Sequence, residues 1–167
     1  YQTKIPNTPP IDLFSHNQIA FHSIMKMFKK SNRVCVSHAT GTGKSYLIGS
    51  LLQKNQNKKT LMVAPTKIIL SELKEKFHYL MKESILMTYS KLSILKRDEV
   101  ENYELLILDE FHRAGAIKWG DGVKLIIQEN PKSLIFGTSA TPYRYFESRD
   151  MSSELFKNNI ASDLSLP

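Results

Sequence analysis

His38-Ala39-Thr40-Gly41-Thr42-Gly43-Lys44-Ser45 joins an apolar run at residues 33–37 to a helix-compatible run at residues 45–52. Its glycines fall where a buried strand turns into a helix. Glycines let backbone N–H groups converge on an anion with no Cβ in the way, and the N-terminus of the following helix adds a positive dipole. The stretch therefore predicts a phosphate-binding loop, in which Lys44 bridges the β- and γ-phosphates of a nucleotide and the Ser45 hydroxyl coordinates Mg²⁺.

One position departs from the general pattern of such loops. The pattern G-x-x-x-x-G-K-[ST] has a glycine at the position where this chain has His38. On this pattern alone, a glycine-rich turn that happens to carry a lysine remains the alternative. The alternation of strands and helices along the chain, and the residues that follow two other strands, favour the phosphate loop.

Length and composition are those of a single folded domain. The chain has 167 residues, of which 41% are hydrophobic and 23% charged, enough for a full hydrophobic core. No apolar stretch approaches the length that crosses a bilayer, and the first residues lack the apolar core of a signal peptide. We therefore expect a cytoplasmic protein without a membrane partner. The formal charge of +7 favours a polyanionic partner such as nucleic acid.

Apolar runs alternate with helical patterns along the chain. The run at residues 104–108 is continuously hydrophobic, as a strand buried on both faces of a parallel sheet requires. We expect an α/β domain in which helices cover both faces of a mostly parallel sheet, a three-layer sandwich. The expected strands cover residues 33–37, 60–64, 84–88, 104–108 and 133–137, and the expected helices cover 15–30, 45–52, 67–78, 123–129 and 151–158.

Polar residues directly follow three of these strands. Ligands of parallel sheets bind beyond the carboxyl ends of the strands, so we expect the phosphate loop, Asp109-Glu110 and Ser139-Ala140-Thr141 at one edge. Asp109 would hold Mg²⁺, and Glu110 would accept a proton from the attacking water. A pair of solvated loop acids is the alternative, but a lysine-bearing phosphate loop nearby favours nucleotide hydrolysis. His112 is placed to link the nucleotide site to residues 139–141 by hydrogen bonds.

The order of these motifs resembles that of superfamily 2 helicases and translocases. Residues 39–45 resemble motif I of that family, whose members carry alanine and no glycine at its start, and Asp109-Glu110-Phe111-His112 resembles motif II in its DExH form. The other similarities, which run in the family's order, are Gln18 with the glutamine that reads adenine, Ala64-Pro65-Thr66 with motif Ia, Thr88-Tyr89-Ser90 with the segment before motif II, and Ser139-Ala140-Thr141-Pro142 with motif III.

The resemblance implies a RecA-like P-loop NTPase domain that couples hydrolysis of Mg-ATP to movement on nucleic acid. Residues 140–144 look most like the branch of restriction-enzyme translocases and related DNA helicases, which favours DNA over RNA as the partner. The implied catalytic residues are Lys44, Asp109, Glu110 and His112, and the implied coupling residues are Ser139, Ala140 and Thr141. ATP would contact Gln18, Thr40, Gly41, Thr42, Gly43, Lys44 and Ser45, and nucleic acid would contact Pro65, Thr66 and Thr88.

The resemblance also implies how the chain is divided. Residues 1–14 would be an extended lead-in, residues 15–145 the ATP-binding domain, and residues 146–167 a tail leading to a second RecA-like domain that supplies arginines to the ATP site. An arginine from another domain is worth roughly 10³–10⁵ in rate, so we expect this chain alone to bind Mg-ATP and turn it over slowly. Two alternatives stay open: a nucleotide-dependent binding switch without unwinding, and an RNA helicase domain, since the basic charge suits both polymers.

Overall fold

A six-stranded sheet forms the centre of the computed structural model, which describes residues 13, 15–38, 43–112, 117–140 and 151–164. The strand order is β3-β2-β4-β5-β1-β6, and every pair of neighbouring strands is parallel. The sheet confirms the expected α/β class. The strands are β1 (Arg33–His38), β2 (Thr60–Ala64), β3 (Ser84–Thr88), β4 (Leu105–Asp109), β5 (Leu134–Ser139) and β6 (Ile160–Leu164).

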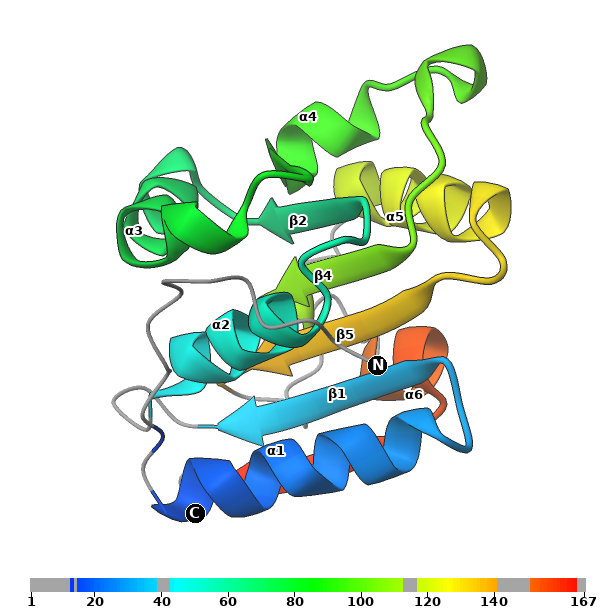
Figure 1. Ribbon diagram of the computed structural model, residues 1–167. Coiled ribbons are helices and arrows are strands. Elements are labelled where there is room, and N and C mark those ends of the chain that lie inside the picture. Colours follow the sequence, from blue (N-terminus) through cyan, green and yellow to red (C-terminus); the bar gives the residue numbers. More distant parts are fainter. Residues whose placement is uncertain (1–12, 14, 39–42, 113–116, 141–150, 165–167) are drawn as a thin grey trace.

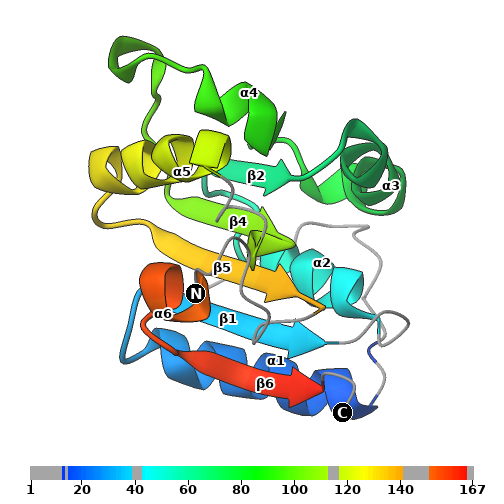
Figure 2. The same cartoon turned by 180° about the vertical axis from the view of Figure 1, so that it is seen from behind.

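Helices cover both faces of this sheet (Figures 1 and 2). Among the described residues, no helix combines the length and the apolar character that crossing a membrane requires. The α-helices are α1 (Ser15–Phe28), α2 (Lys44–Lys54), α3 (Lys67–Phe77), α4 (Tyr89–Ser93), α5 (Ile117–Glu129) and α6 (Met151–Phe156), and the short 3₁₀ helices include η1 (His78–Leu80) and η2 (Arg97–Glu99).

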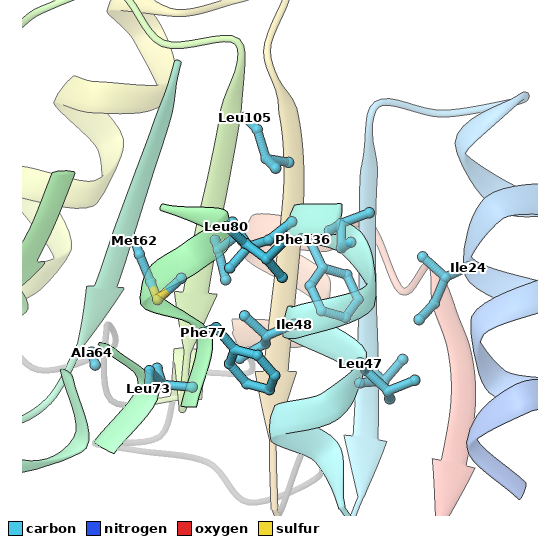
Figure 3. Packing of buried hydrophobic residues seen from close by; sticks show 14 of the residues in the cluster. Ile24, Leu47, Ile48, Met62, Ala64, Leu73, Phe77, Leu80, Leu105 and Phe136 are labelled. Atoms are coloured by element: carbon cyan, nitrogen blue, oxygen red, sulfur yellow. The ribbon is translucent and has the colours of Figure 1, made fainter. Parts of the chain in front are cut away.

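Two hydrophobic clusters hold the three layers together. Successive residues of β4 alternate between them: Ile107 packs in the cluster under α1, α2 and α3, whereas Leu106 and Leu108 pack in the cluster under α4, α5 and α6. Figure 3 shows the first cluster, in which Phe77 lies beside Ile48. Because both faces of β4 are buried, its sequence is continuously apolar instead of alternating.

The C-terminal segment contains a strand that the sequence pattern did not predict. Residues 160–164 form β6, which pairs in parallel with β1 and extends the sheet beyond residue 145. The sequence pattern missed this strand for two reasons. Large apolar side chains occupy only its two ends, Ile160 and Leu164, as an edge strand allows. In addition, the register shifts between Cys35 and Val36 of β1, which breaks the alternation along β6.

Helix α5 begins at Ile117, six residues before the expected start. Gly120 and Gly122 suggested a loop because glycine is a poor helix former. The structure explains Gly122 by the close approach of α4: a Cβ at this position would lie 2.8 Å from the carbonyl oxygen of Leu92. Packing against α4 therefore selects a residue that local propensity disfavours.

We expect Gly122→Ala to destabilise the domain. In an open helix the change would stabilise by about 0.5–1 kcal/mol, but here the new methyl group meets the backbone of α4, and overpacking of this kind costs about 1–3 kcal/mol. Urea unfolding should show a lower free energy of unfolding. Asp121→Ala, at the exposed neighbouring position, is the control and should leave stability unchanged or slightly raised; a stabilised Gly122→Ala would contradict the packing argument.

Candidate nucleotide site

The carboxyl ends of β1, β5 and β4 lie next to one another, because β5 runs between the other two strands (Figure 1). Lys44, the first residue of α2, follows β1, and Glu110 follows β4. The ammonium Nζ of Lys44 forms an ion pair with Oε1 of Glu110, and the two side chains are only 20% and 18% exposed. The structure thus brings together a lysine and an acid that lie 66 residues apart in the chain.

Gly43 starts α2 in a conformation that favours glycine. It is the N-cap residue of the helix, with φ 77° and ψ 28°, a left-handed backbone that side chains with a Cβ rarely adopt. Its carbonyl oxygen accepts hydrogen bonds from the backbone N–H of Tyr46 at 3.0 Å and from Nδ2 of Asn17 at 3.2 Å. Of the predicted nucleotide-binding residues, Thr40, Gly41 and Thr42 lie outside the described residues.

Asp109 is the last residue of β4 and is only 6% exposed. Its Oδ1 accepts a hydrogen bond from Oγ1 of Thr138, its register partner on β5. Burial raises the pKa of this carboxyl group, whereas the charge of Lys44 and the Thr138 hydrogen bond act in the opposite direction. Thr138 was not predicted as a site residue; it lies directly after the expected strand at residues 133–137, but it is part of β5.

Lys44 shows the complementary effect. Burial lowers the pKa of its ammonium group, and the neighbouring carboxylate of Asp109 opposes this shift. Desolvation therefore outweighs attraction for both groups, as it does where buried charges have incomplete compensation. An anionic ligand at this position would favour the charged form of Lys44.

The residue that pairs with Lys44 has an unusual backbone. Glu110 has φ 52°, a region that costs a residue with a Cβ about 1–3 kcal/mol. The peptide group that joins Asp109 to Glu110 has a hydrogen bond of its own: the hydroxyl of buried Tyr89 donates to the carbonyl oxygen of Asp109 at 2.9 Å. Tyr89 stands in the weakly matching segment before motif II, and this contact could not be predicted from that match.

His112 makes the predicted link to the end of β5. Its Nδ1 lies 2.8 Å from Oγ of Ser139 and 3.5 Å from Oε2 of Glu110. The hydrogen bond that the sequence predicts between His112 and this segment is therefore confirmed, while its catalytic and coupling roles stay predictions. Ala140 follows β5 as a partly buried bend, and Thr141 lies outside the described residues.

The other predicted site residues make local contacts within their own elements or with the segment just before them. Gln18 is exposed on α1, where its Nε2 donates to the carbonyl oxygen of Leu13 at 3.1 Å. Thr66, which follows partly exposed Pro65, caps α3 by accepting from the N–H of Ile69, and Thr88 caps α4 by accepting from the N–H of Lys91. Each threonine thus has a structural role, and contact with nucleic acid stays a prediction for them.

The Asp109 carboxylate and the Ser45 hydroxyl suit Mg²⁺, which takes part of its ligands from water and phosphate, better than a metal ion that protein side chains alone would hold. Within the described part of the chain, no three His, Cys, Asp or Glu side chains form a group that could hold a metal ion. Mg²⁺ is usually held by one or two carboxylates, water and substrate phosphates. Asp109 and the Ser45 hydroxyl supply ligand types of this kind.

The fold and the order of the motifs are those of the first RecA-like domain of superfamily 2 helicases and translocases. The sequence profile of ResIII, the family described as "Type III restriction enzyme, res subunit", matches residues 10–93 and 78–144. The chain therefore belongs to the ResIII family. No curated protein matches its sequence significantly.

Solved structures show the same RecA-like fold. The chain is similar to the SWI2/SNF2 ATPase core of Sulfolobus solfataricus in complex with dsDNA, with TM-score 0.68 and 19% identity over 93% of this chain and 37% of that one. It is also similar to the UvsW helicase from bacteriophage T4, with TM-score 0.66 and 14% identity over 94% of this chain and 61% of that one. A third similar structure is a fragment of a putative HsdR subunit of a type I restriction enzyme from Vibrio vulnificus, with TM-score 0.64 and 18% identity over 93% of this chain and 31% of that one. The chain thus spans less than two thirds of each of these structures.

We expect stability to fall in acid partly because of His38. Its side chain is fully buried, and its pKa is lowered to about 4, first by burial and then by the charge of His16; Asp163 opposes and Lys44 adds to the shift. The unfolded chain takes up this proton near pH 6.5 and the folded chain only near pH 4, so the contribution is complete above pH 6.5. It is lost as the pH falls toward 4, by about 2–3 kcal/mol between pH 7 and pH 4.5.

Urea unfolding at these two pH values measures the effect. The variant His38→Gln, which cannot take up a proton, should lose correspondingly less stability than the wild type on acidification. Equal losses in the two proteins would show that the proton is taken up elsewhere.

Proposed function

We propose that this domain binds and hydrolyses Mg-ATP and couples hydrolysis to movement on DNA, as the first RecA-like half of a helicase or translocase. The observation that carries the proposal is the convergence of Lys44, Asp109 and Glu110 at the end of a parallel sheet. A nucleotide site needs a cation for the phosphates, a carboxylate for the metal and a second carboxylate for water. Membership of the ResIII family and the dsDNA in the similar SWI2/SNF2 structure support DNA as the partner.

Nucleotide binding would exchange the partner of Lys44. In this structure its ammonium group is paired with Glu110, and burial lowers its pKa. The β- and γ-phosphates of ATP carry more negative charge than one carboxylate, so they would draw Lys44 away and restore the charged form. The N-terminus of α2 and the left-handed Gly43 add N–H donors for the same phosphates.

The exchange would leave Glu110 free to act on water. A carboxylate released from Lys44 at this position can orient the attacking water and accept its proton. Asp109 and Ser45 would hold Mg²⁺, which neutralises charge on the phosphates in phosphoryl transfer. His112, which contacts both Glu110 and Ser139, is placed to carry the state of the nucleotide to residues 139–141.

The edge that carries Thr66 and Thr88 is the proposed nucleic-acid contact. These residues start α3 and α4 directly after the neighbouring strands β2 and β3. Threonine hydroxyls and backbone N–H groups are common donors to phosphate oxygens. Pro65 would lie beside this contact, and Gln18 on α1 is proposed to bind adenine.

The test is Glu110→Gln in the full 167-residue chain. We expect single-turnover hydrolysis of Mg-ATP, measured with single-stranded DNA present, to slow by at least about 10²-fold, because the general base is removed. We also expect the Kd of Mg-ATP to fall, because Lys44 no longer has to leave an ionised partner. If the domain is instead a nucleotide-dependent switch, Glu110→Gln should still bind ATP and should not show this loss of hydrolysis rate relative to the wild type.

Glu129→Gln is the matched control. It removes the charge of an acid that pairs with Arg97, far from the nucleotide site, and should change neither rate nor affinity. If Glu110→Gln hydrolyses ATP at the wild-type rate, Glu110 is not the general base. If it binds Mg-ATP more weakly than the wild type, the partner exchange of Lys44 is wrong.

A further inference from the structure

Two hydrogen bonds from outside motif I meet the two flanks of the phosphate loop. After the loop, Nδ2 of Asn17 donates to the carbonyl oxygen of Gly43 at 3.2 Å. Before the loop, Nε2 of His38 lies 2.8 Å from Oγ of Ser162. Asn17 belongs to α1 and Ser162 to β6, and both elements pack against the β1 side of the domain (Figure 2).

The contact of Asn17 controls the orientation of one peptide. Asn17 is fully buried, and it shares the Gly43 carbonyl with the N–H of Tyr46. Because a peptide group is planar, two donors that fix this carbonyl also fix the N–H of Lys44. That N–H is among the helix N-terminal donors that face an anion.

The contact of Ser162 fixes the last residue of β1. His38 is fully buried, and its other ring nitrogen, Nδ1, has no hydrogen-bond partner among the described residues. The register shift in β6 places Ser162 opposite Val36, on the face of β1 to which His38 also points. The imidazole that replaces the usual loop glycine is thus held by the edge strand.

We propose that Asn17 and Ser162 are positioning residues of the nucleotide site: Asn17 acts through the Gly43 carbonyl to orient the N–H of Lys44, and Ser162 acts through His38 to fix the end of β1. The inference rests on the proposed function and deepens it. It gives β6 a role in nucleotide binding, and it gives the imidazole of His38 a function in place of the glycine of the general pattern.

The test compares Asn17→Ala and Ser162→Ala with the wild type in the 167-residue chain, by titration with a fluorescent ATP analogue and Mg²⁺. We expect each change to raise Kd about three- to tenfold, which is the value of one hydrogen bond. Ser162→Thr keeps the hydroxyl group and should bind like the wild type, which a merely structural role of the strand would not require.

Asn130→Ala is the control for lost stability. Asn130 is also buried and makes three hydrogen bonds, to Tyr103, Glu101 and Ile126, at the opposite end of the sheet. Its thermal midpoint should fall while Kd stays unchanged. If Asn17→Ala and Ser162→Ala bind with the wild-type Kd, or if Asn130→Ala loses as much affinity as they do, this inference is wrong. The proposed function would not be affected by either result. Failure of the wild-type chain to bind Mg-ATP would overturn the proposed function and this inference with it.

Discussion

The ion pair between Lys44 and Glu110 is the interaction around which the candidate site is built. It forms only because β5 brings the ends of β1 and β4 to one edge, and because α2 starts directly after the phosphate loop. Burial disfavours the charged forms of Lys44 and Asp109, because it lowers the pKa of the lysine and raises the pKa of the aspartate. A site of this kind is costly without its ligand, and the left-handed backbone of Glu110 adds to that cost. Binding of an anionic ligand would relieve the electrostatic part of it.

Most of the fold could be predicted because the central strands are buried on both faces. Continuous apolar runs such as residues 104–108 have few alternative interpretations, and β2 and β3 have the predicted bounds. The convergence of Lys44 with Asp109 and Glu110 at the end of β4 followed from the parallel sheet alone, since the ends of parallel strands meet at one edge. The chemistry of the motifs suggested roles for Lys44, Ser45, Asp109 and Glu110, and the resemblance to superfamily 2 motors added the nucleic-acid contacts; all of these roles stay proposals.

The parts that could not be predicted are those that tertiary contacts decide. Strand β6 has little apolar pattern because it lies at an edge, and its register shift removes what alternation remains. The early start of α5 depends on the space that Gly122 leaves for α4. Asn17 and Tyr89 hold backbone carbonyls of distant segments, and a polar residue in a helix gives no sign in the sequence of which carbonyl it reaches.

A crystal structure of the 167-residue chain with Mg²⁺ and a non-hydrolysable ATP analogue would test the central claim most directly. The account predicts that Nζ of Lys44 leaves Glu110 for the oxygens of the β- and γ-phosphates, with the metal ion between Ser45 and Asp109 and with Glu110 facing the γ-phosphate. A triphosphate bound elsewhere, or bound while Lys44 remains paired with Glu110, would contradict it.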